Sequence, residues 1–160
     1  MVPGYGPQPS LAMIVGEAPG VEEEKLGRPF VGRSGKMLDT GLSSVGIARE
    51  GCYLTYVVKE VPTRDGKVRA PFPDEIEEWG SILRAEVEAT SPACILALGK
   101  TATFALTDIE DKVPPGSKVG NVWTAWHPTY VNNNRRLLSE WVQQLLPWAE
   151  ALNVAMFEVP

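Results

Sequence analysis

The sequence predicts an α/β protein, a three-layer α/β/α sandwich with a four-stranded, mainly parallel central sheet. Its 160 residues suit one domain, because single cores commonly form at roughly 100–200 residues. Four short apolar segments have the length and composition of strands that are buried on both faces. Helix-like segments separate them, and alternating strands and helices form parallel sheets covered on both sides. We therefore expect one domain over residues 1–160.

The elements follow in order along the chain. The predicted strands are residues 11–16, 53–58, 93–98 and 122–126, each rich in apolar or β-forming residues. Helices are predicted over residues 34–45, from 74 to about 87, over 101–106 and over 137–148, with loops at 62–73 and 108–120. Asp74 and Glu77 resemble a capping box at the start of the second helix. In that helix Ile76, Trp79 and Leu83 share one face, which predicts a core-facing stripe.

Polar residues follow three of the predicted strands directly. Glu17 comes after the first strand, Lys59 after the second and His127 after the fourth. In parallel sheets the functional groups gather at the carboxyl ends of the strands. The sequence therefore predicts a functional site at this edge of the sheet.

Charge and composition limit the classes of function. A formal net charge of -5 argues against nucleic-acid binding by bulk charge, because phosphate binding depends on local Lys and Arg. Such residues do cluster at 28–36, 64–69 and 135–136, either as a basic strip or as ordinary solvated surface. The N-terminus lacks a signal pattern, and no apolar run reaches the ~20 residues that span a bilayer. We expect a cytoplasmic monomer that does not bind membranes.

Cysteine and histidine usage predicts no metal site. The two cysteines, Cys52 and Cys94, lie far apart in apolar runs and are typical of small buried hydrophobes. His127 is the sole histidine and has no accompanying ligand cluster or triad motif, so by itself it is either structural or functional. Residues 99–101 (GKT) follow a strand, but a nucleotide-binding phosphate loop would need glycine where Cys94 stands.

A dense, ordered set of short segments carries the strongest signal. It comprises residues 16–20 (GEAPG), Glu23, residues 27–32 (GRPFVG), residues 57–59 (VVK) and residues 127–128 (HP). In this order the set resembles the uracil-DNA glycosylases, particularly the iron–sulfur type called family 4, from Val2 to about Arg136. The resemblance implies an enzyme that flips a base out of single- or double-stranded DNA. Such an enzyme then hydrolyses the N-glycosidic bond, with water as nucleophile and without a catalytic metal.

The resemblance also implies catalytic roles for two residues. Glu17 would lie near the anomeric carbon, where its carboxylate positions or activates water and counters the positive charge that develops on the sugar. His127 would donate a hydrogen bond from a neutral imidazole to a carbonyl oxygen of the leaving base. For Glu17, a loop-stabilising or solvated role is the alternative.

Further residues are implied in binding. The base-binding set is Gly16, Glu23, Phe30 and Tyr56. In that set Phe30 would be the aromatic on which the flipped base stacks, with a core position as its alternative, and Glu23 would support the pocket or be solvated. The DNA-binding set is Arg28, Gly32, Lys59, Pro128, Thr129, Tyr130 and Val131. The last four of these would form a wedge loop in the minor groove.

The sequence departs from the family pattern at two places. Glu60 and Trp79 occupy two of the four cluster-cysteine positions and the other two precede Met1, so we expect no cofactor. Residues 55–59 read TYVVK where the family reads TNVVK, so Tyr56 replaces an asparagine that forks two hydrogen bonds to uracil. Losing such a fork costs roughly 1–3 kcal/mol of base discrimination. Tyr56 could fill the pocket, accept a different base or block entry.

Two functions follow from this pattern. The first is a monofunctional DNA glycosylase that acts on uracil or on another damaged or modified base. The second is a non-enzymatic DNA-binding or replication-partner module that retains the glycosylase fold. Glu17, Phe30 and His127 favour the enzyme. Tyr56 favours the binding module, as does the wedge segment, which has Tyr130 and Val131 where the resembled family usually has leucines and an arginine.

Overall fold

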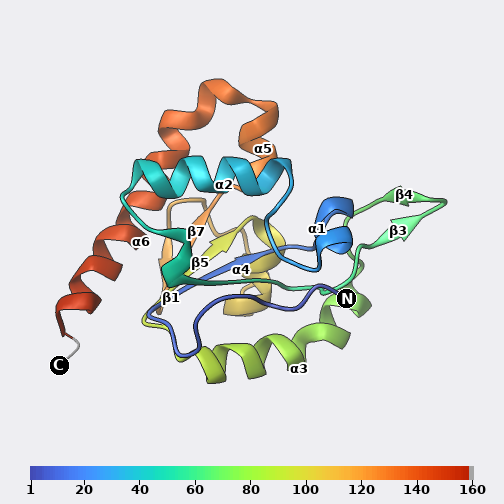
Figure 1. Ribbon diagram of the computed structural model, residues 1–160, viewed down its shortest axis with the longest axis horizontal. Coiled ribbons are helices and arrows are strands. Elements are labelled where there is room, and N and C mark those ends of the chain that lie inside the picture. The colour runs from blue at the N-terminus through green and yellow to red at the C-terminus, as the bar shows by residue number, and fades with distance from the viewer. Residues whose placement is uncertain (159–160) are drawn as a thin grey trace.

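The computed structural model describes residues 1–158 and has a twisted sheet at its centre (Figure 1). The strand order is β2-β1-β5-β7-β6. Four strands are parallel: β1 (Ala12–Gly16), β2 (Cys52–Tyr56), β5 (Cys94–Leu98) and β7 (Val122–Ala125). Every residue of these four is buried, as strands covered on both faces require. The predicted α/β sandwich is confirmed.

The sheet has five strands instead of the four expected. The additional strand, β6 (Lys118–Val119), pairs antiparallel with the start of β7. A tight turn joins the two strands, and Gly120 occupies the left-handed region there with φ +58°, which glycine adopts at little cost. Two residues are too few to show the alternation of apolar and polar side chains that indicates a strand. The sequence therefore predicts only a loop over residues 108–120.

Helices cover both faces of the sheet (Figure 1). On one face α2 (Arg33–Ser44), α5 (Pro128–Asn133) and α6 (Leu138–Glu158) pack on a core that includes the fully buried rings of Trp141 and Trp148. Their indole N–H groups donate to the carbonyl oxygens of Trp126 at 3.0 Å and Cys94 at 3.2 Å, so neither buried donor is left unpaired.

The other face is covered by α3 (Pro73–Thr90) and α4 (Lys100–Thr107). Leu83 is buried there, and Ile76 and Trp79 pack against the same cluster. The predicted core stripe of α3 is therefore confirmed. None of the helices within residues 1–158 combines the length and hydropathy needed to cross a bilayer.

Several short elements were not predicted from the sequence. They are α1 (Val21–Leu26), the 3-10 turns η1 (Arg49–Gly51) and η2 (Arg135–Leu137), and a hairpin of β3 (Thr63–Arg64) and β4 (Lys67–Val68). The hairpin projects from the molecule beside α1 (Figure 1). Because α1 follows β1 after four residues and the hairpin follows β2 after six, both elements lie on the side of the carboxyl edge of the sheet.

Candidate active site

Glu17 is held by a hydrogen bond from a neighbouring helix. It is the first residue after β1 and is half-buried. Its Oε2 accepts from Thr101 Oγ1 at 2.5 Å, and Thr101 lies in the first turn of α4. The carboxylate therefore has a fixed orientation at the carboxyl edge. Residues 99–101 were predicted only to lack a phosphate loop, with no role for Thr101, although a helix that starts directly after a strand end at this edge is a usable signal for a site residue.

His127 is fixed as a one-sided hydrogen-bond donor. It is the N-cap of α5, and its Nδ1 accepts from the backbone N–H of Thr129 at 3.1 Å. A backbone amide can only donate, so the neutral ring carries its proton on Nε2. Burial lowers the pKa of His127, and the nearby charge of Glu17 partly opposes that shift. The ring is therefore neutral at pH 7, with Nε2–H available to an acceptor.

The backbone at Gly99 allows His127 to lie close to the end of β5. Gly99 has φ +92°, and a Cβ added there would lie 3.3 Å from His127 Cβ. Its N–H donates to the carbonyl oxygen of Ala125 at 2.8 Å. A larger residue would strain the backbone and push the imidazole away, so this glycine positions the ring.

Phe30 and Tyr56 form a buried aromatic pair. Their ring centroids are 4.8 Å apart with planes tilted by 35°, and the residues are only 1% and 2% exposed. Tyr56 Oη accepts a hydrogen bond from the Phe30 backbone N–H at 2.7 Å. A Cβ at Gly16 would lie 2.7 Å from Phe30 Cζ, so the end of β1 closes tightly over the pair. Tyr56 therefore fills the space beside Phe30.

The backbone of Phe30 is strained. Its φ is +53°, a left-handed conformation that is uncommon for an aromatic residue and costs of order 1–3 kcal/mol. This conformation directs the amide of Phe30 at the Tyr56 hydroxyl. The amide donor and the adjoining ring are both in contact with tyrosine, and no base has access to the ring face that Tyr56 covers.

Glu23 is a structural clamp for the segment that carries Phe30. It is 4% exposed, and Oε1 accepts from Gly20 N–H at 2.9 Å. Its Oε2 accepts from the N–H groups of Val31 at 2.9 Å and Gly32 at 2.6 Å. Charge-assisted bonds of this kind are about twice as strong as neutral ones. Glu23 thus ties α1 to the turn beyond Phe30.

The expected wedge loop is helical, and only part of it is exposed. Val131 is fully buried against the core and Pro128 is also buried, because α5 packs against α2. This corrects the expectation that these two side chains enter DNA. Thr129 is exposed. Tyr130 is 46% exposed and packs edge-to-face on Trp126 with centroids 5.3 Å apart, so it is the aromatic ring of α5 that a nucleic acid can reach.

Lys59 lies inside the protein, which corrects its expected place on the DNA-binding surface. It is 1% exposed, and its Nζ forms an ion pair with Glu86 and donates to Thr55 Oγ1 at 2.8 Å and to the carbonyl oxygen of Tyr56. Glu86 Oε2 also accepts from the hydroxyls of Tyr53 and Thr55, each at 2.7 Å. This network joins the end of β2 to α3. No signal in the sequence identifies Glu86, since helix positions alone do not reveal a buried partner.

Arg28 and Gly32 lie at the surface of the candidate site. The exposed Arg28 guanidinium lies 4.8 Å above the Tyr5 ring. Gly32 is the N-cap of α2 and, with Glu23 and Thr129, lines a cleft of about 260 Å³. Of the predicted site residues, Glu23, Gly32 and Thr129 line this cleft, whereas Glu17, Phe30 and His127 are not among its lining residues.

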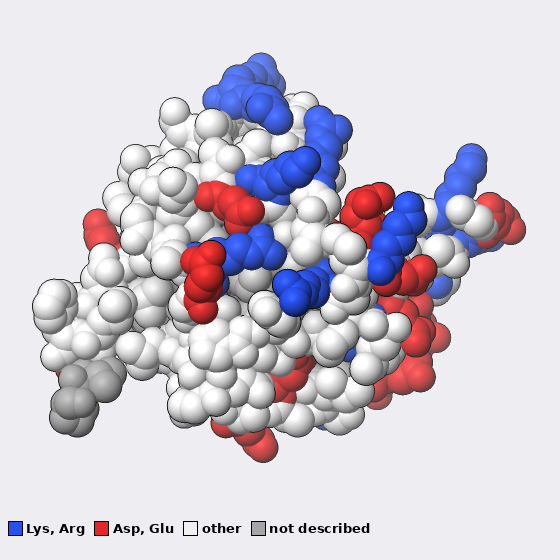
Figure 2. Space-filling model, in the orientation of Figure 1, with Lys and Arg blue, Asp and Glu red and all other residues white. Residues whose placement is uncertain are grey.

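Basic side chains gather over the upper part and the right-hand side of the molecule in the view of Figure 2. They lie over α2, over the segment that follows α5 and on the hairpin. The exposed basic residues of these elements are Arg33, Lys36, Arg64, Lys67, Arg135 and Arg136. The protein thus has local positive surfaces despite its net charge of -5.

The cysteines do not fit a four-thiolate cluster. Cys52 and Cys94 are buried at the amino ends of β2 and β5, one on each side of Ala12. Burial raises the pKa of the Cys52 thiol to about 12, whereas a metal ligand must be a thiolate. Within residues 1–158 no group of three or more His, Cys, Asp or Glu side chains could hold a metal ion.

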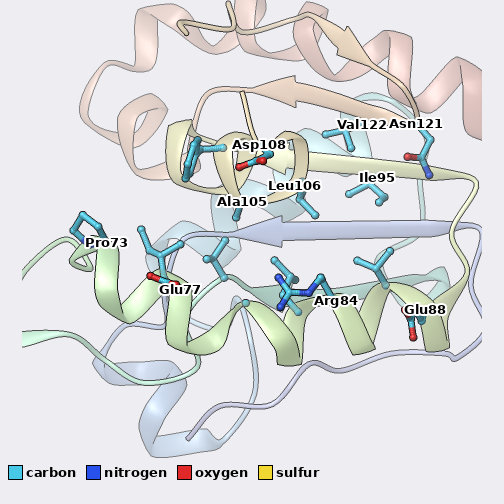
Figure 3. A pocket seen from close by; sticks show the side chains of 16 residues that line it. Pro73, Glu77, Arg84, Glu88, Ile95, Ala105, Leu106, Asp108, Asn121 and Val122 are labelled. Carbon is cyan, nitrogen blue, oxygen red and sulfur yellow. The ribbon is translucent and has the colours of Figure 1, made fainter. Parts of the chain in front are cut away.

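A groove of about 780 Å³ lies between α3 and α4, away from these residues (Figure 3). Ile76, Leu83, Ile95 and Val122 contribute apolar walls, and Arg84 is among the charged residues at its rim. None of the predicted site residues lines it. The candidate site therefore does not coincide with this larger cavity.

Comparisons with known proteins agree with this architecture. A family profile described as the uracil DNA glycosylase superfamily matches residues 3–150. The type-4 uracil-DNA glycosylase of Archaeoglobus fulgidus is 42% identical over 112 residues, which cover 68% of this chain and 55% of that protein. The type-4 enzyme of Thermotoga maritima is 39% identical over 144 residues, covering 84% of this chain and 73% of that protein.

A third relative has a different name. A DNA polymerase of Bacillus phage SP01 is 36% identical over 105 residues, covering 65% of this chain but 11% of the polymerase. The chain spans about half the length, 55%, of its Archaeoglobus relative. The match of the family profile to residues 3–150 establishes that the chain belongs to the uracil DNA glycosylase superfamily.

Proposed function

We propose that this protein is a monofunctional DNA glycosylase that hydrolyses the N-glycosidic bond of uracil, or of another damaged or modified base, after the base has flipped out of DNA. One observation carries the proposal. A carboxylate oriented by Thr101 and a neutral imidazole with a free Nε2–H lie at the same edge of the sheet, close enough that the charge of Glu17 acts on His127.

These two groups suit the two ends of the breaking bond. As the bond lengthens, positive charge grows on the sugar and negative charge grows on the base. Glu17 stabilises the sugar and orients the attacking water, while His127 donates to the base oxygen that gains charge. Fixed groups of this kind act without reorganising during the reaction. The names of the type-4 relatives support uracil as the first base to test.

Tyr56 must leave the Phe30 ring before a base can stack there. In the present arrangement Tyr56 takes both the ring contact and the backbone donor of Phe30. Excision by the wild type therefore requires a swing of the tyrosine, and we expect the rate to include the free energy of that opening.

A non-enzymatic module is the second candidate, and two observations favour it. Tyr56 closes the space beside Phe30, and one relative is a DNA polymerase in which the matching region is a small part of the chain. Under this reading the fold binds DNA or a replication partner and excises no base.

Oligonucleotides with single lesions test the proposal. Purified protein is incubated with DNA carrying uracil, hydroxymethyluracil, hypoxanthine or no lesion, in single- and double-stranded form, and abasic sites are scored. The glycosylase should leave abasic sites with at least one lesion. Glu17→Ala and His127→Ala should each slow base release while DNA binding stays largely intact. Binding without release of any base by the wild type would favour the module, and unchanged rates in both variants would remove these residues from the mechanism.

A further inference from the structure

The β3–β4 hairpin is a preorganised element. Thr63 pairs with Val68 and Arg64 pairs with Lys67, and Asp65-Gly66 forms the two-residue turn with φ values of +52° and +74°. Asp-Gly with both residues left-handed is the combination that matches the twist of paired strands. The hairpin therefore holds its two tip cations in a fixed relationship.

Arg69 anchors the base of the hairpin to α3. Its guanidinium donates to the carbonyl oxygens of Thr63 at 3.1 Å and Ala70 at 3.0 Å, and to Glu75 Oε1 at 2.6 Å. It also lies 3.8 Å above the ring of Phe72. Arg69 is thus committed to internal contacts, whereas Arg64 and Lys67 form no ion pair with any residue of 1–158.

The two tip cations face each other without compensation. Arg64 and Lys67 are directly opposite across the ladder and are exposed. Neither they nor Asp65 belong to any of the ion pairs formed within residues 1–158. Like charges at directly opposite positions destabilise a strand pair. An anion bound between the two side chains would remove this repulsion, so the arrangement favours an anionic partner.

The hairpin also lies where DNA would approach the candidate site. It follows β2 at the carboxyl edge of the sheet, the edge where Glu17 follows β1 and His127 follows β7, and it projects from the body of the molecule (Figures 1 and 2). In α5, the expected wedge segment, Tyr130 is the one large side chain that is exposed. This segment therefore offers DNA little contact area. A second contact outside the site would hold DNA while a base is displaced.

We infer that the β3–β4 hairpin is a DNA-contact element in which Arg64 and Lys67 together bind the phosphate backbone beside the flipped nucleotide. The inference rests on the proposed action on DNA, and it adds a contact that does not touch the reacting base. The hairpin therefore contributes to affinity and to the salt dependence of binding, and leaves the chemical step unchanged.

The test measures binding of labelled uracil-containing oligonucleotides at several salt concentrations. Arg64→Gln/Lys67→Gln is compared with wild type, with the charge-preserving Arg64→Lys/Lys67→Arg and with the control Arg84→Gln/Lys112→Gln, which removes two exposed cations elsewhere. Each lost phosphate contact reduces the slope of log K against log salt by about 0.9 for duplex and about 0.7 for single strands. For Arg64→Gln/Lys67→Gln we therefore expect the slope to fall by the amount that one or two phosphate contacts contribute, and we expect binding to be roughly tenfold weaker at 0.1 M salt.

The outcomes separate the hairpin from the proposed function. A lower slope in Arg64→Gln/Lys67→Gln alone, with unchanged excision at saturating DNA and no loss of thermal stability, supports the hairpin contact. If wild type binds DNA but this variant binds with the same slope and affinity, or if the control loses as much, the hairpin inference is overturned while the function stands. If wild type binds no DNA, the proposed function and the inference both fail. The duplex and single-strand slopes tell which form of DNA the hairpin contacts.

Discussion

The hydroxyl of Tyr56 accepts the backbone N–H of Phe30 at 2.7 Å while the two rings pack 4.8 Å apart. A flipped base would need the same two features, a flat apolar surface and a polar group at its edge. Tyr56 therefore acts as an internal substitute for a base, and its removal should decide between an enzyme with a closed pocket and a protein that only binds.

Replacing Tyr56 by the family's asparagine should open this space. Tyr56→Asn removes the ring and supplies an amide that can fork two hydrogen bonds to uracil, which is worth about 1–3 kcal/mol. Uracil excision should rise by roughly tenfold or more, without a similar gain for other bases. The measurement is single-turnover release of each base, with a thermal melt to confirm that the variant is folded.

Tyr56→Phe is the matched control. It keeps the ring over Phe30, removes only the hydroxyl that accepts the Phe30 N–H and supplies no amide, so it should give a much smaller gain in uracil excision than Tyr56→Asn. If wild type excises uracil well and Tyr56→Asn abolishes that activity, tyrosine reads the base and the account of a closed pocket is wrong. If neither form cleaves any base while both bind DNA, the binding-module reading is correct.

Thr101→Val should weaken catalysis through Glu17. The substitution removes the hydroxyl that donates to the carboxylate, so the group can rotate away from the sugar. We expect the rate constant of base release to fall about tenfold or more, since misplaced catalytic groups lose much of their effect, with little change in DNA affinity. Thr101→Ser keeps the hydroxyl and should retain most of the activity. Equal rates for Val and Ser would show that Thr101 has no such role.

The sequence predicted the frame of the molecule better than its side-chain contacts. Buried strands leave continuous apolar runs, so the four parallel strands and the edge where they end were visible. The placement of Glu17 and His127 at that edge followed from topology. Lys59 shows the limit, because a lysine after a strand can turn outward to phosphate or inward to an acid. Glu86 lies 27 residues later in the chain, in α3, and it decides between these two outcomes, because only packing brings the two side chains together.

The wedge segment fails for a related reason. The resemblance predicted a loop over residues 128–132, yet proline at the first helical position and His127 as N-cap start a helix. Helical geometry then sends Val131 to the core and leaves Tyr130 outside. For Tyr56 the sequence left three alternatives open, one of which was that its side chain fills the pocket. The sequence alone does not determine which rotamer a pocket residue adopts.

The single histidine allows a direct pH test. Burial lowers the pKa of His127, so its NMR titration should give a midpoint below 6.5 with the proton on Nε2 in the neutral form. The unfolded chain binds that proton at higher pH than the folded one, so this group lowers stability as pH falls below about 6.5 and adds no such penalty above it. Glu17→Gln removes the charge that raises the pKa and should shift the midpoint lower still. A midpoint above 6.5 would contradict the buried neutral ring.

Glu23→Gln should destabilise the protein by loosening the turn beyond Phe30. The carboxylate accepts three backbone N–H groups, and a neutral amide has one acceptor oxygen and no charge to replace it. Hydrogen bonds to charged groups contribute about 1.5–3 kcal/mol each, so we expect a loss of about 2–4 kcal/mol in the free energy of unfolding. Glu22→Gln, at an exposed neighbour paired only with Lys25, should change stability by less than about 0.5 kcal/mol. Similar losses in both variants would argue against the clamp.

Lys59→Met tests whether this lysine is structural or binds DNA. The substitution leaves the Glu86 carboxylate buried without its counter-charge, and breaking one side of such a pair typically costs about 3–5 kcal/mol. Adding Glu86→Gln removes the orphaned charge and should restore part of that loss, which a double-mutant cycle in denaturant measures.

DNA binding by Lys59→Met should keep the salt dependence of wild type, because the ammonium is 1% exposed and already paired. A phosphate-binding lysine behaves in the opposite way: its removal lowers the slope of log K against log salt by about 0.9 for duplex DNA and leaves folding intact. The two roles therefore predict different losses in different experiments. An unchanged free energy of unfolding together with a reduced slope would return Lys59 to the DNA-binding surface that the sequence first predicted.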